Sequence, residues 1–305
     1  MRGKLKKIGC YILVIILLPY IVTVFLNGPM IVSKANVEEM KVKVQNESSE
    51  VTSVSLKDYG IGILAREIPA SHEIEMLKAQ AIMVRTKLYK SMQENGRDVV
   101  FSEEFWTQSE MQEAWEGLDF YKYYNKLESA WQATESQVLM YEEKLIYTPF
   151  FSLSNGSTRD GEELLGKNYP YLKIKECPLD IEETEQLQTI TLDAKLHAKN
   201  QKEDGIGIEV ISLDSAGYVL KVRVGEEEIN GEEFRKNYNL ASSCFSVQEY
   251  EGKIRITTRG VGHGIGLSQN TGNKMAENGA TAKEILEYFY EGAAIREIAD
   301  VVIMK

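Results

Sequence analysis

Residues 8–26 form an apolar run without a charged side chain, and a basic cluster between Arg2 and Lys7 precedes it. About 20 such residues are enough for a helix to cross a bilayer, and flanking basic residues stay on the cytoplasmic side. We therefore predict a single N-terminal transmembrane helix at the cell membrane, with the rest of the chain outside the cytoplasm. A cleaved signal peptide is the alternative, because Ser33 and Ala35 provide small side chains at a suitable spacing.

Composition divides the chain into three predicted segments. Residues 1–26 are a basic tail and membrane anchor, residues 27–52 are a polar stalk, and residues 53–305 are the outer domain. A chain of 305 residues is long enough for one large domain or two lobes. Beyond residue 35 the chain has 30 basic and 46 acidic residues, a net charge of −16. Because nucleic acids require a basic face, no nucleic-acid partner is expected.

Helical patterns occur early and late in the outer domain, with strand patterns between them. This order is typical of an α+β fold rather than of a parallel βαβ series. We predict a mixed α/β outer domain with antiparallel strands and a cleft between two lobes. The helices are expected at residues 56–66, 73–93, 231–238, 267–278 and 281–290, and the strands at 137–152, 206–224, 245–247 and 253–258.

Cysteine and histidine are too few for a disulfide framework or a zinc-protease motif. Cys10 lies in the apolar run, so at most one disulfide, between Cys177 and Cys244, can form in the outer domain. None of the three histidines belongs to an H-E-x-x-H sequence, so a metalloprotease of that type is not expected.

A helix break at Pro69 separates Glu67 from a helix that carries two inward-facing cations. Lys78 and Arg85 are seven residues apart and lie on one face, at the edge of the apolar stripe. A cation that faces the interior requires an anionic partner, because an unpaired buried charge is costly. Two interpretations are open: salt bridges to core carboxylates, or a cleft that binds an anionic ligand. By spacing alone, Glu67 is an ordinary surface acid.

Four glycines at every second position, from Gly260 to Gly266, surround His263. Glycine lets the backbone approach a ligand closely, so we expect His263 to face a ligand; a glycine-rich turn with an incidental histidine is the alternative. The run lacks the Lys-Ser/Thr pair of a phosphate-binding P-loop. Ser268 lacks the second glycine of a nucleophile elbow, so a serine hydrolase is not expected.

Taken together, these motifs resemble those of the stage II sporulation protein D family, which includes an amidase-enhancer branch. Residues 64–71 with 77–86 resemble its opening motif, and residues 262–269 are similar to its closing motif. Between them, residues 134–158 resemble the family's hairpin and small-residue loop, and the Pro-Tyr-Leu sequence around Tyr171 resembles a further signature. The resemblance covers nearly the whole predicted outer domain.

The resemblance implies a membrane-anchored lytic transglycosylase that cleaves peptidoglycan glycan strands without stem peptides during engulfment in sporulation. Glu67 corresponds to the family's catalytic acid, which alone serves as general acid and base and leaves 1,6-anhydro-muramic ends. The implied partners are the glycan strands and stage II sporulation proteins P, an amidase, and M. The other predicted site residues bind substrate, with Arg85 preferred for its lactyl carboxylate: Lys78, Arg85, Tyr171, His263, Ser268 and Gln269.

The implied reaction requires no metal and no cofactor. Some family members carry a zinc site soon after the first motif, but residues 101–131 contain no cysteine or histidine here, and we expect Trp106 and Trp115 to fill that space. Two other functions are compatible with these motifs: a non-catalytic module that enhances a cell-wall amidase, and a scaffold in the engulfment complex. The intact Glu67 and the absence of wall-binding repeats favour the enzyme.

Overall fold

Two large hydrophobic clusters organise the computed structural model, which describes residues 40–45, 49–193 and 207–298. The predicted transmembrane segment, residues 8–26, lies outside this description. Within the described ranges, no helix combines the length and the apolar character needed to cross a bilayer. The fold-class prediction is corrected for these ranges: they form a mixed α/β domain without a membrane-spanning helix.

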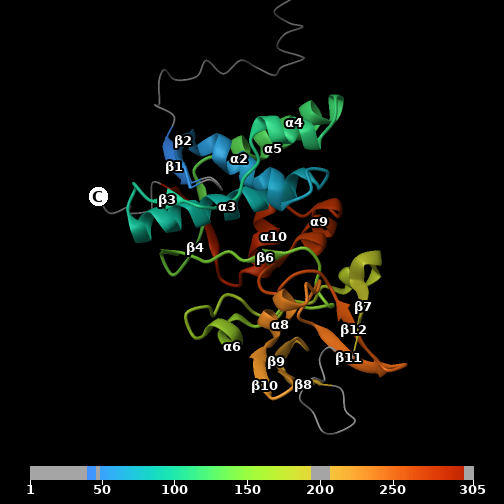
Figure 1. The fold of residues 1–305 in the computed structure, drawn as a ribbon. Helices are drawn as coiled ribbons and strands as arrows, with labels where there is room; N and C mark the ends of the chain where they lie inside the picture. Colours follow the sequence, from blue (N-terminus) through green and yellow to red (C-terminus); the bar gives the residue numbers. More distant parts are fainter. Residues whose placement is uncertain (1–39, 46–48, 194–206, 299–305) are drawn as a thin grey trace, which may run out of the picture. The chain divides into compact units, whose positions relative to one another are not determined.

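Helices from both ends of the described chain enclose the first core. These are α2 (Leu56–Glu67), α3 (Ile74–Asn95), α5 (Leu118–Ala133), α9 (Gln269–Glu277) and α10 (Ala282–Phe289). The late helices α9 and α10, drawn in red in Figure 1, pack against the early helix α3. The predicted helices in these regions are confirmed, and the packing brings the two sequence motifs into one half of the domain.

The boundaries of α2 follow from its sequence. Its N-cap is Ser55, whose hydroxyl accepts a hydrogen bond from the Asp58 N–H at 3.0 Å. The helix ends at Glu67, two residues before Pro69, which disfavours helical backbone in the residue before it. Gly60 allows a close approach to α5, because a Cβ at this position would lie 2.2 Å from the Trp131 ring. The interior glycine therefore serves helix packing.

A small sheet covers one end of the first core. The strands β1 (Lys41–Gln45) and β2 (Val51–Ser55) pair antiparallel, and β3 (Val100–Phe101) pairs parallel with β1. Alternate residues of β1, Val42 and Val44, are buried in the first core. The strand β1 thus belongs to the packed domain although it lies in the segment predicted as a stalk.

The predicted hairpin is confirmed in β4 (Gln137–Tyr141) and β5 (Lys144–Leu145), and β14 (Ala294–Glu297) pairs antiparallel with β4. Its turn residues, Glu142 and Glu143, have positive φ values of 47° and 62°, as a two-residue hairpin turn of this twist requires. The strand β6 (Phe150–Phe151) does not continue the hairpin. It pairs parallel with β13 (Leu267–Ser268), and β3 pairs parallel with β1, so the predicted antiparallel pairing does not hold for β6 and β3.

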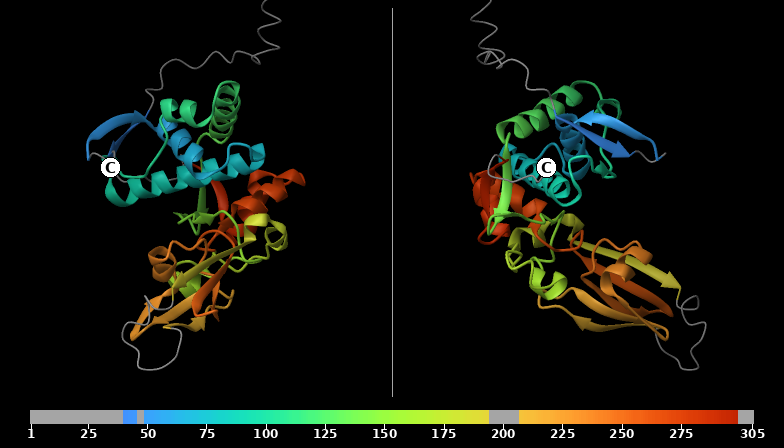
Figure 2. Two further views of the ribbon diagram at one scale, coloured as in Figure 1. Left: turned by 45° about the vertical axis from the view of Figure 1, so that its right-hand side comes forward. Right: turned by 90° about the vertical axis from the view of Figure 1, so that its left-hand side faces the viewer.

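Two three-stranded antiparallel sheets and one helix form the second core. The first sheet has the order β11-β12-β7 and the second the order β10-β9-β8. Figure 2 shows β7, in yellow, beside the later strand β12, in orange. Buried side chains from the sheets and the helix meet in this core, as Ile254, Ile256 and Phe234 do. The elements are β7 (Leu187–Asp193), β8 (Ile208–Leu213), β9 (Val219–Val224), β10 (Glu227–Asn230), α8 (Gly231–Asn237), β11 (Phe245–Tyr250) and β12 (Lys253–Arg259).

Short elements and aromatic packing complete the domain. Trp106 and Trp115 lie edge to face with 5.9 Å between their ring centroids. Both belong to residues 101–131, where some family members carry a zinc site. Cys177 and Cys244 are both buried free thiols, so the one disulfide that the sequence allowed in the outer domain is not formed. The remaining short helices are α4 (Gln108–Ala114), α6 (Gly161–Leu165), η1 (Pro178–Glu182) and η2 (Thr184–Gln186).

Candidate functional site

Glu67 is the last residue of α2 and is half-buried. The next residue, Ile68, is the C-cap; its N–H donates to the Leu64 carbonyl oxygen at 3.1 Å, and its side chain is buried in the first core. The helix end is therefore fixed on both sides of the acid: by the α2 hydrogen bonds before it and by apolar packing after it. This gives the Glu67 side chain a defined position beside the protein surface.

The surroundings of Glu67 disfavour its ionised form. Burial raises the pKa of Glu67 to about 7, and the nearby Glu103 carboxylate adds to this effect. Three other neighbours oppose the shift: the cations Lys87 and Arg66, and the Gln80 side chain. Burial exceeds their combined effect, so at neutral pH a large fraction of the chains carry a protonated Glu67 that can donate a proton.

Gln80 of α3 is fully buried near the acid. Neither its amide nitrogen nor its amide oxygen has a hydrogen-bond partner in good geometry within the described part of the chain. Buried amides are normally paired, because an unpaired polar group costs free energy. Gln80 therefore has both a donor and an acceptor to offer to Glu67 or to a bound group beside it.

The two sequence motifs meet at Glu67. Gln269, the first residue of α9, is buried, and its side-chain amide nitrogen donates to the Glu67 carbonyl oxygen at 2.9 Å. This oxygen lies at the C-terminus of α2, where carbonyl groups lack partners within the helix. Of the substrate-binding residues predicted from sequence, Gln269 is thus brought into direct contact with the acid's backbone, where it positions the acid.

Two hollows lie on either side of an ion pair next to the acid. One, of about 660 Å³, is lined by residues that include Arg66 and Glu103. The other, of about 180 Å³, is lined by residues that include Lys87 and Tyr147. Lys87 and Glu103 form an ion pair, with side chains 44% and 29% exposed. Because each partner lines a different hollow, this ion pair connects the two hollows beside Glu67.

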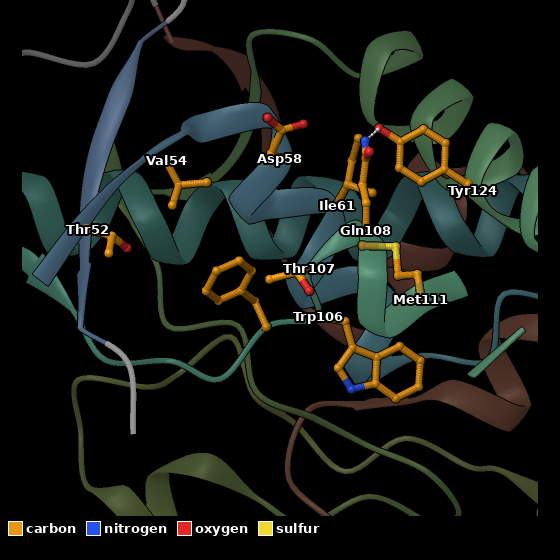
Figure 3. Close-up of a pocket in the computed structure, with 10 residues that line it drawn as sticks. Thr52, Val54, Asp58, Ile61, Trp106, Thr107, Gln108, Met111 and Tyr124 are labelled. Atoms are coloured by element: carbon orange, nitrogen blue, oxygen red, sulfur yellow. Dashed lines mark hydrogen bonds between the residues drawn. The ribbon is translucent and has the colours of Figure 1, made fainter. Parts of the chain in front are cut away.

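Two further hollows extend this series. A hollow of about 460 Å³ shares Lys90, Ile146 and Tyr147 with the one that contains Lys87. At the other end, the pocket in Figure 3, of about 350 Å³, shares Trp106 and Thr107 with the hollow that contains Glu103. All four are lined by segments that pack on the first core. Lys87, Glu103 and Arg66, which line the first two hollows, act on the charge of Glu67, so the acid lies near these hollows. The cleft between two lobes stays a prediction.

The pocket in Figure 3 has one aromatic and one polar part. Trp106, Met111 and Ile61 line its apolar part, and Figure 3 shows the Met111 side chain between the other two. The Gln108 amide nitrogen donates to the Tyr124 hydroxyl oxygen at 2.9 Å. A flat aromatic face beside hydrogen-bonding groups suits a sugar ring, which has apolar faces and a polar edge.

Arg85 is buried as predicted, whereas Lys78 is only half-buried, and the partners of both lie within the domain. Lys78 pairs with Glu75 at 2.6 Å. Arg85 is 3% exposed, and its guanidinium donates to the carbonyl oxygens of Thr134 at 2.7 Å and Trp131 at 2.9 Å. These carbonyls belong to the C-terminal end of α5, so Arg85 stabilises that helix end. The structure thus gives both cations partners inside the fold, and neither faces Glu67.

The side chain of His263 is hydrogen-bonded within the glycine loop itself. All four alternate glycines have positive φ, and the loop lies so close to neighbouring backbone that a Cβ on Gly266 would be 2.0 Å from the Pro149 carbonyl oxygen. The His263 Nδ1 accepts a hydrogen bond from the Ile265 N–H at 3.1 Å, and its ring packs near Phe151. Burial lowers the pKa of His263, so the imidazole is neutral at pH 7. The substrate-binding role predicted for His263 stays a prediction.

Ser268 and Tyr171 are both buried and hydrogen-bonded within the domain. The Ser268 hydroxyl donates to Asp180 at 2.7 Å and caps α9. The Tyr171 hydroxyl oxygen accepts a hydrogen bond from the Tyr147 N–H at 3.1 Å, beside the hollow of about 460 Å³. Tyr171 and Tyr147 therefore line that hollow together, while Ser268 directly precedes Gln269 and holds the start of α9.

Three buried charged residues were not predicted from the sequence: Asp180, Arg159 and Asp214. Asp180 is fully buried and accepts hydrogen bonds from the Ser154 N–H and from the side chains of Ser268, Asn270 and Thr271. Arg159 pairs with Asp214 at 2.6 Å and also donates to the His263 carbonyl oxygen at 3.1 Å. Arg159 follows the small-residue loop directly, which was the available sequence signal; Asp180 stands in no motif.

Comparison with known proteins agrees with the motifs. The family model described as stage II sporulation protein (SpoIID) matches residues 44–141. The chain is 30% identical over 274 residues to stage II sporulation protein D of Bacillus subtilis (strain 168). This alignment covers 85% of this chain and 79% of that protein. It is 29% identical over 280 residues to the protein of the same name from Bacillus amyloliquefaciens. That alignment covers 86% of this chain and 79% of the relative.

A more distant relative has a different name. The chain is 25% identical over 292 residues to the amidase enhancer of Bacillus subtilis (strain 168), and the alignment covers 77% of this chain and 40% of that protein. The two stage II relatives are more similar and are covered over most of their length. The chain belongs to the stage II sporulation protein D family of sporulation proteins.

Proposed function

We propose that this domain is a lytic transglycosylase that cleaves peptidoglycan glycan strands lacking stem peptides, with Glu67 as its single general acid and base. The observation that carries the proposal is the state of Glu67: a half-buried acid with a pKa of about 7, fixed at a helix end beside a series of hollows. A general acid works best when its pKa lies near the working pH.

The reaction requires one carboxyl group in two successive roles. Protonated Glu67 gives its proton to the glycosidic oxygen as the bond to the anomeric carbon breaks. The resulting Glu67 carboxylate then takes the proton of the 6-hydroxyl of the same muramic acid, whose oxygen attacks the anomeric carbon and closes a 1,6-anhydro ring. Most glycosidases need a second carboxylate as nucleophile or base.

This proposal sets the location and the partners of the domain. Peptidoglycan lies outside the cytoplasm, so we place the domain there during engulfment in sporulation. An amidase must remove the stem peptides before such strands exist, and stage II sporulation protein P is the proposed supplier. Stage II sporulation protein M is the proposed further member of the assembly.

The direct test uses the purified full-length chain with glycan strands from which the stem peptides have been removed. Mass spectrometry should detect 1,6-anhydro-muramic ends, and Glu67→Gln should lower their rate of formation by about 10²–10⁴-fold while the chain stays folded. Glu128→Gln, an ion-paired glutamate of α5, is the matched control and should keep the activity. Anhydro ends formed by the Glu67→Gln chain at nearly the normal rate would exclude Glu67 as the acid.

The similarity to an amidase enhancer supports a second candidate, a non-catalytic module that increases the activity of a cell-wall amidase. The two functions differ in their dependence on Glu67. An enhancer effect on an added amidase should survive Glu67→Gln, because binding does not require a transferable proton. A chain that produces no anhydro ends but still accelerates the amidase, with or without Glu67, would favour the enhancer.

A further inference from the structure

Lys87 and Glu103 form an ion pair that acts on the candidate acid, and both side chains are partly open to solvent. The two side chains are 44% and 29% exposed, and each lines a different hollow. A polymer that occupies both hollows must therefore pass the ion pair. Among the charges that act on Glu67, that of Lys87 has the largest effect and that of Glu103 the next largest.

The other cations of this region are less suited to bind a ligand. Arg85 is buried against the end of α5, and Lys78 pairs with Glu75 within one turn of α3. Arg66 pairs with Glu104 and lines only the hollow on the Glu103 side. Of Lys78, Arg85, Arg66 and Lys87, only Lys87 lines the hollow of about 180 Å³. Its partner Glu103 lines the hollow of about 660 Å³.

Resting on the proposed function, we propose that Lys87 is a specificity-determining residue that binds a carboxylate of the polysaccharide, which takes the place of Glu103. In the unbound protein the Glu103 carboxylate forms an ion pair with the ammonium group of Lys87. A strand with free carboxylates that lies across the ion pair offers the same chemical group. The exchange replaces one ion pair by another, so the strand gains its contact without leaving Lys87 unpaired. Glu103 then turns to solvent, for which its exposure leaves room.

The proposal predicts opposite effects for the two partners. We measure strand binding by calorimetry with the full-length chain in a Glu67→Gln background, which stops cleavage. Two strands are compared: one with free lactyl carboxylates and one with these groups amidated. Lys87→Gln should weaken binding of the carboxylate strand about 3–10-fold, as expected for a partly exposed charge-assisted contact. Glu103→Gln should strengthen it by about 2–5-fold, because the competing carboxylate is gone. Neither substitution should change binding of the amidated strand.

The controls use a second ion pair of the same kind. Lys57 and Glu128 are 2.6 Å apart, with side chains 33% and 28% exposed, and neither acts on the charge of Glu67. Lys57→Gln and Glu128→Gln should leave the preference for carboxylate strands unchanged. An ion pair with a purely structural role would give the same sign for Lys87→Gln and Glu103→Gln, or an equal change on both strands, and either result overturns the proposal.

This test is independent of the proposed cleavage. A chain that forms no anhydro ends but shows the opposite effects of Lys87→Gln and Glu103→Gln would lose the enzymatic function and keep the carboxylate site. A chain that cleaves strands but binds both kinds equally well would keep the enzymatic function and lose the role of Lys87.

Discussion

A single glutamate at a helix end carries most of the chemistry proposed for this domain. Burial outweighs the cations Lys87 and Arg66 and raises the pKa of Glu67 to about 7. The ionised form of Glu67 is therefore stabilised less in the folded chain than in the unfolded chain, where its pKa is near the ordinary value of 4.5. A residue kept in this state has a thermodynamic signature that does not depend on any substrate.

This signature appears in the stability of Glu67→Gln. Between pH 4.5 and 7 the folded wild type holds a proton that the unfolded chain has lost, so the wild type loses stability as the pH rises through this window. Glutamine does not titrate. The variant should therefore gain about 1–3 kcal/mol relative to wild type between pH 4.5 and pH 8. Urea unfolding of both chains at pH 5 and pH 8 measures the difference, and an equal gap at both values would contradict the raised pKa.

Catalysis should show the same titration. Because the first proton transfer requires protonated Glu67, kcat/KM for strand cleavage should fall about tenfold for each pH unit above about 7. Mass-spectrometric rates between pH 6 and pH 9 give the profile. A rate that stays constant to pH 9 would mean that another group supplies the proton.

Gln269 is expected to position the acid rather than to bind the strand. Gln269→Leu removes the 2.9 Å hydrogen bond to the Glu67 carbonyl oxygen but keeps a similar volume. We expect kcat to fall about 10–100-fold, because small displacements of a reacting group are costly, while strand affinity changes less than about twofold. An equal loss of affinity and of kcat would instead show direct contact between Gln269 and the strand.

Sequence alone identifies some of these residues but not their partners. The helical wheel places Arg85 on an inward face correctly, while Lys78 is half-buried. It cannot show that the anion for Lys78 is Glu75, or that Arg85 meets carbonyl groups instead of a carboxylate. The raised pKa of Glu67 is likewise hidden in the sequence, since it depends first on burial and then on Lys87 and Glu103, all of which only the fold provides.

Among the elements, the C-terminal end of α5 depends most on one distant side chain. The Arg85 guanidinium donates to carbonyl oxygens of Trp131 and Thr134 and lies 4.1 Å from the centre of the Trp131 ring. The same tryptophan packs against Gly60 of α2. Arg85 thus joins α3, α5 and α2 at one point.

Replacement of Arg85 should therefore reduce stability. Arg85→Met leaves buried carbonyl groups without donors and should lower the free energy of unfolding by about 2–4 kcal/mol. Lys78→Met is the control on the same helix and should cost less than about 1 kcal/mol, because its ion pair is partly exposed. Thermal unfolding measures both. A stable Arg85→Met chain with lost strand binding would restore the substrate-binding role that the resemblance implied.

The long helices and the hairpins were predictable because their signals are local. Ser55 and Pro69 bound α2, and the Glu142–Glu143 turn sits in an alternating pattern. The strand β7 was not predicted, since the alternation of Ile190 and Leu192 is short and both side chains are only partly buried. Its strand character comes from pairing with β12, more than 60 residues later in the chain.

For the whole described domain, Asp180 is the main polar link between distant segments. Its carboxylate accepts hydrogen bonds from the loop at Ser154 and from three residues of the β13–α9 region, up to 91 positions away. These donors are neutral, so the charge is stabilised by hydrogen bonds without an ion pair. The loop, η1 and α9 should therefore unfold together.

Asp180→Asn tests this link at nearly constant volume. The new amide group faces donors with a donor of its own, so we expect a loss of about 2–4 kcal/mol in unfolding free energy. Asp160→Asn, at the N-cap of α6, should change stability by less than about 0.5 kcal/mol, because asparagine caps helices equally well. Similar losses for both variants would show that Asp180 has no special role. No sequence motif predicts Asp180, because its donors come together only in the folded chain.

The hydrogen bond between Gln269 and Glu67 also has a consequence for the making of the protein. Its two residues are 202 positions apart. A ribosome adds about 5–20 residues per second, so roughly 10–40 s pass between the synthesis of the acid and that of its anchor. Until then the nascent chain carries Glu67 on an early helix without the bond that fixes its backbone. A domain built in this way acquires the full arrangement around Glu67 only when most of its length has been translated.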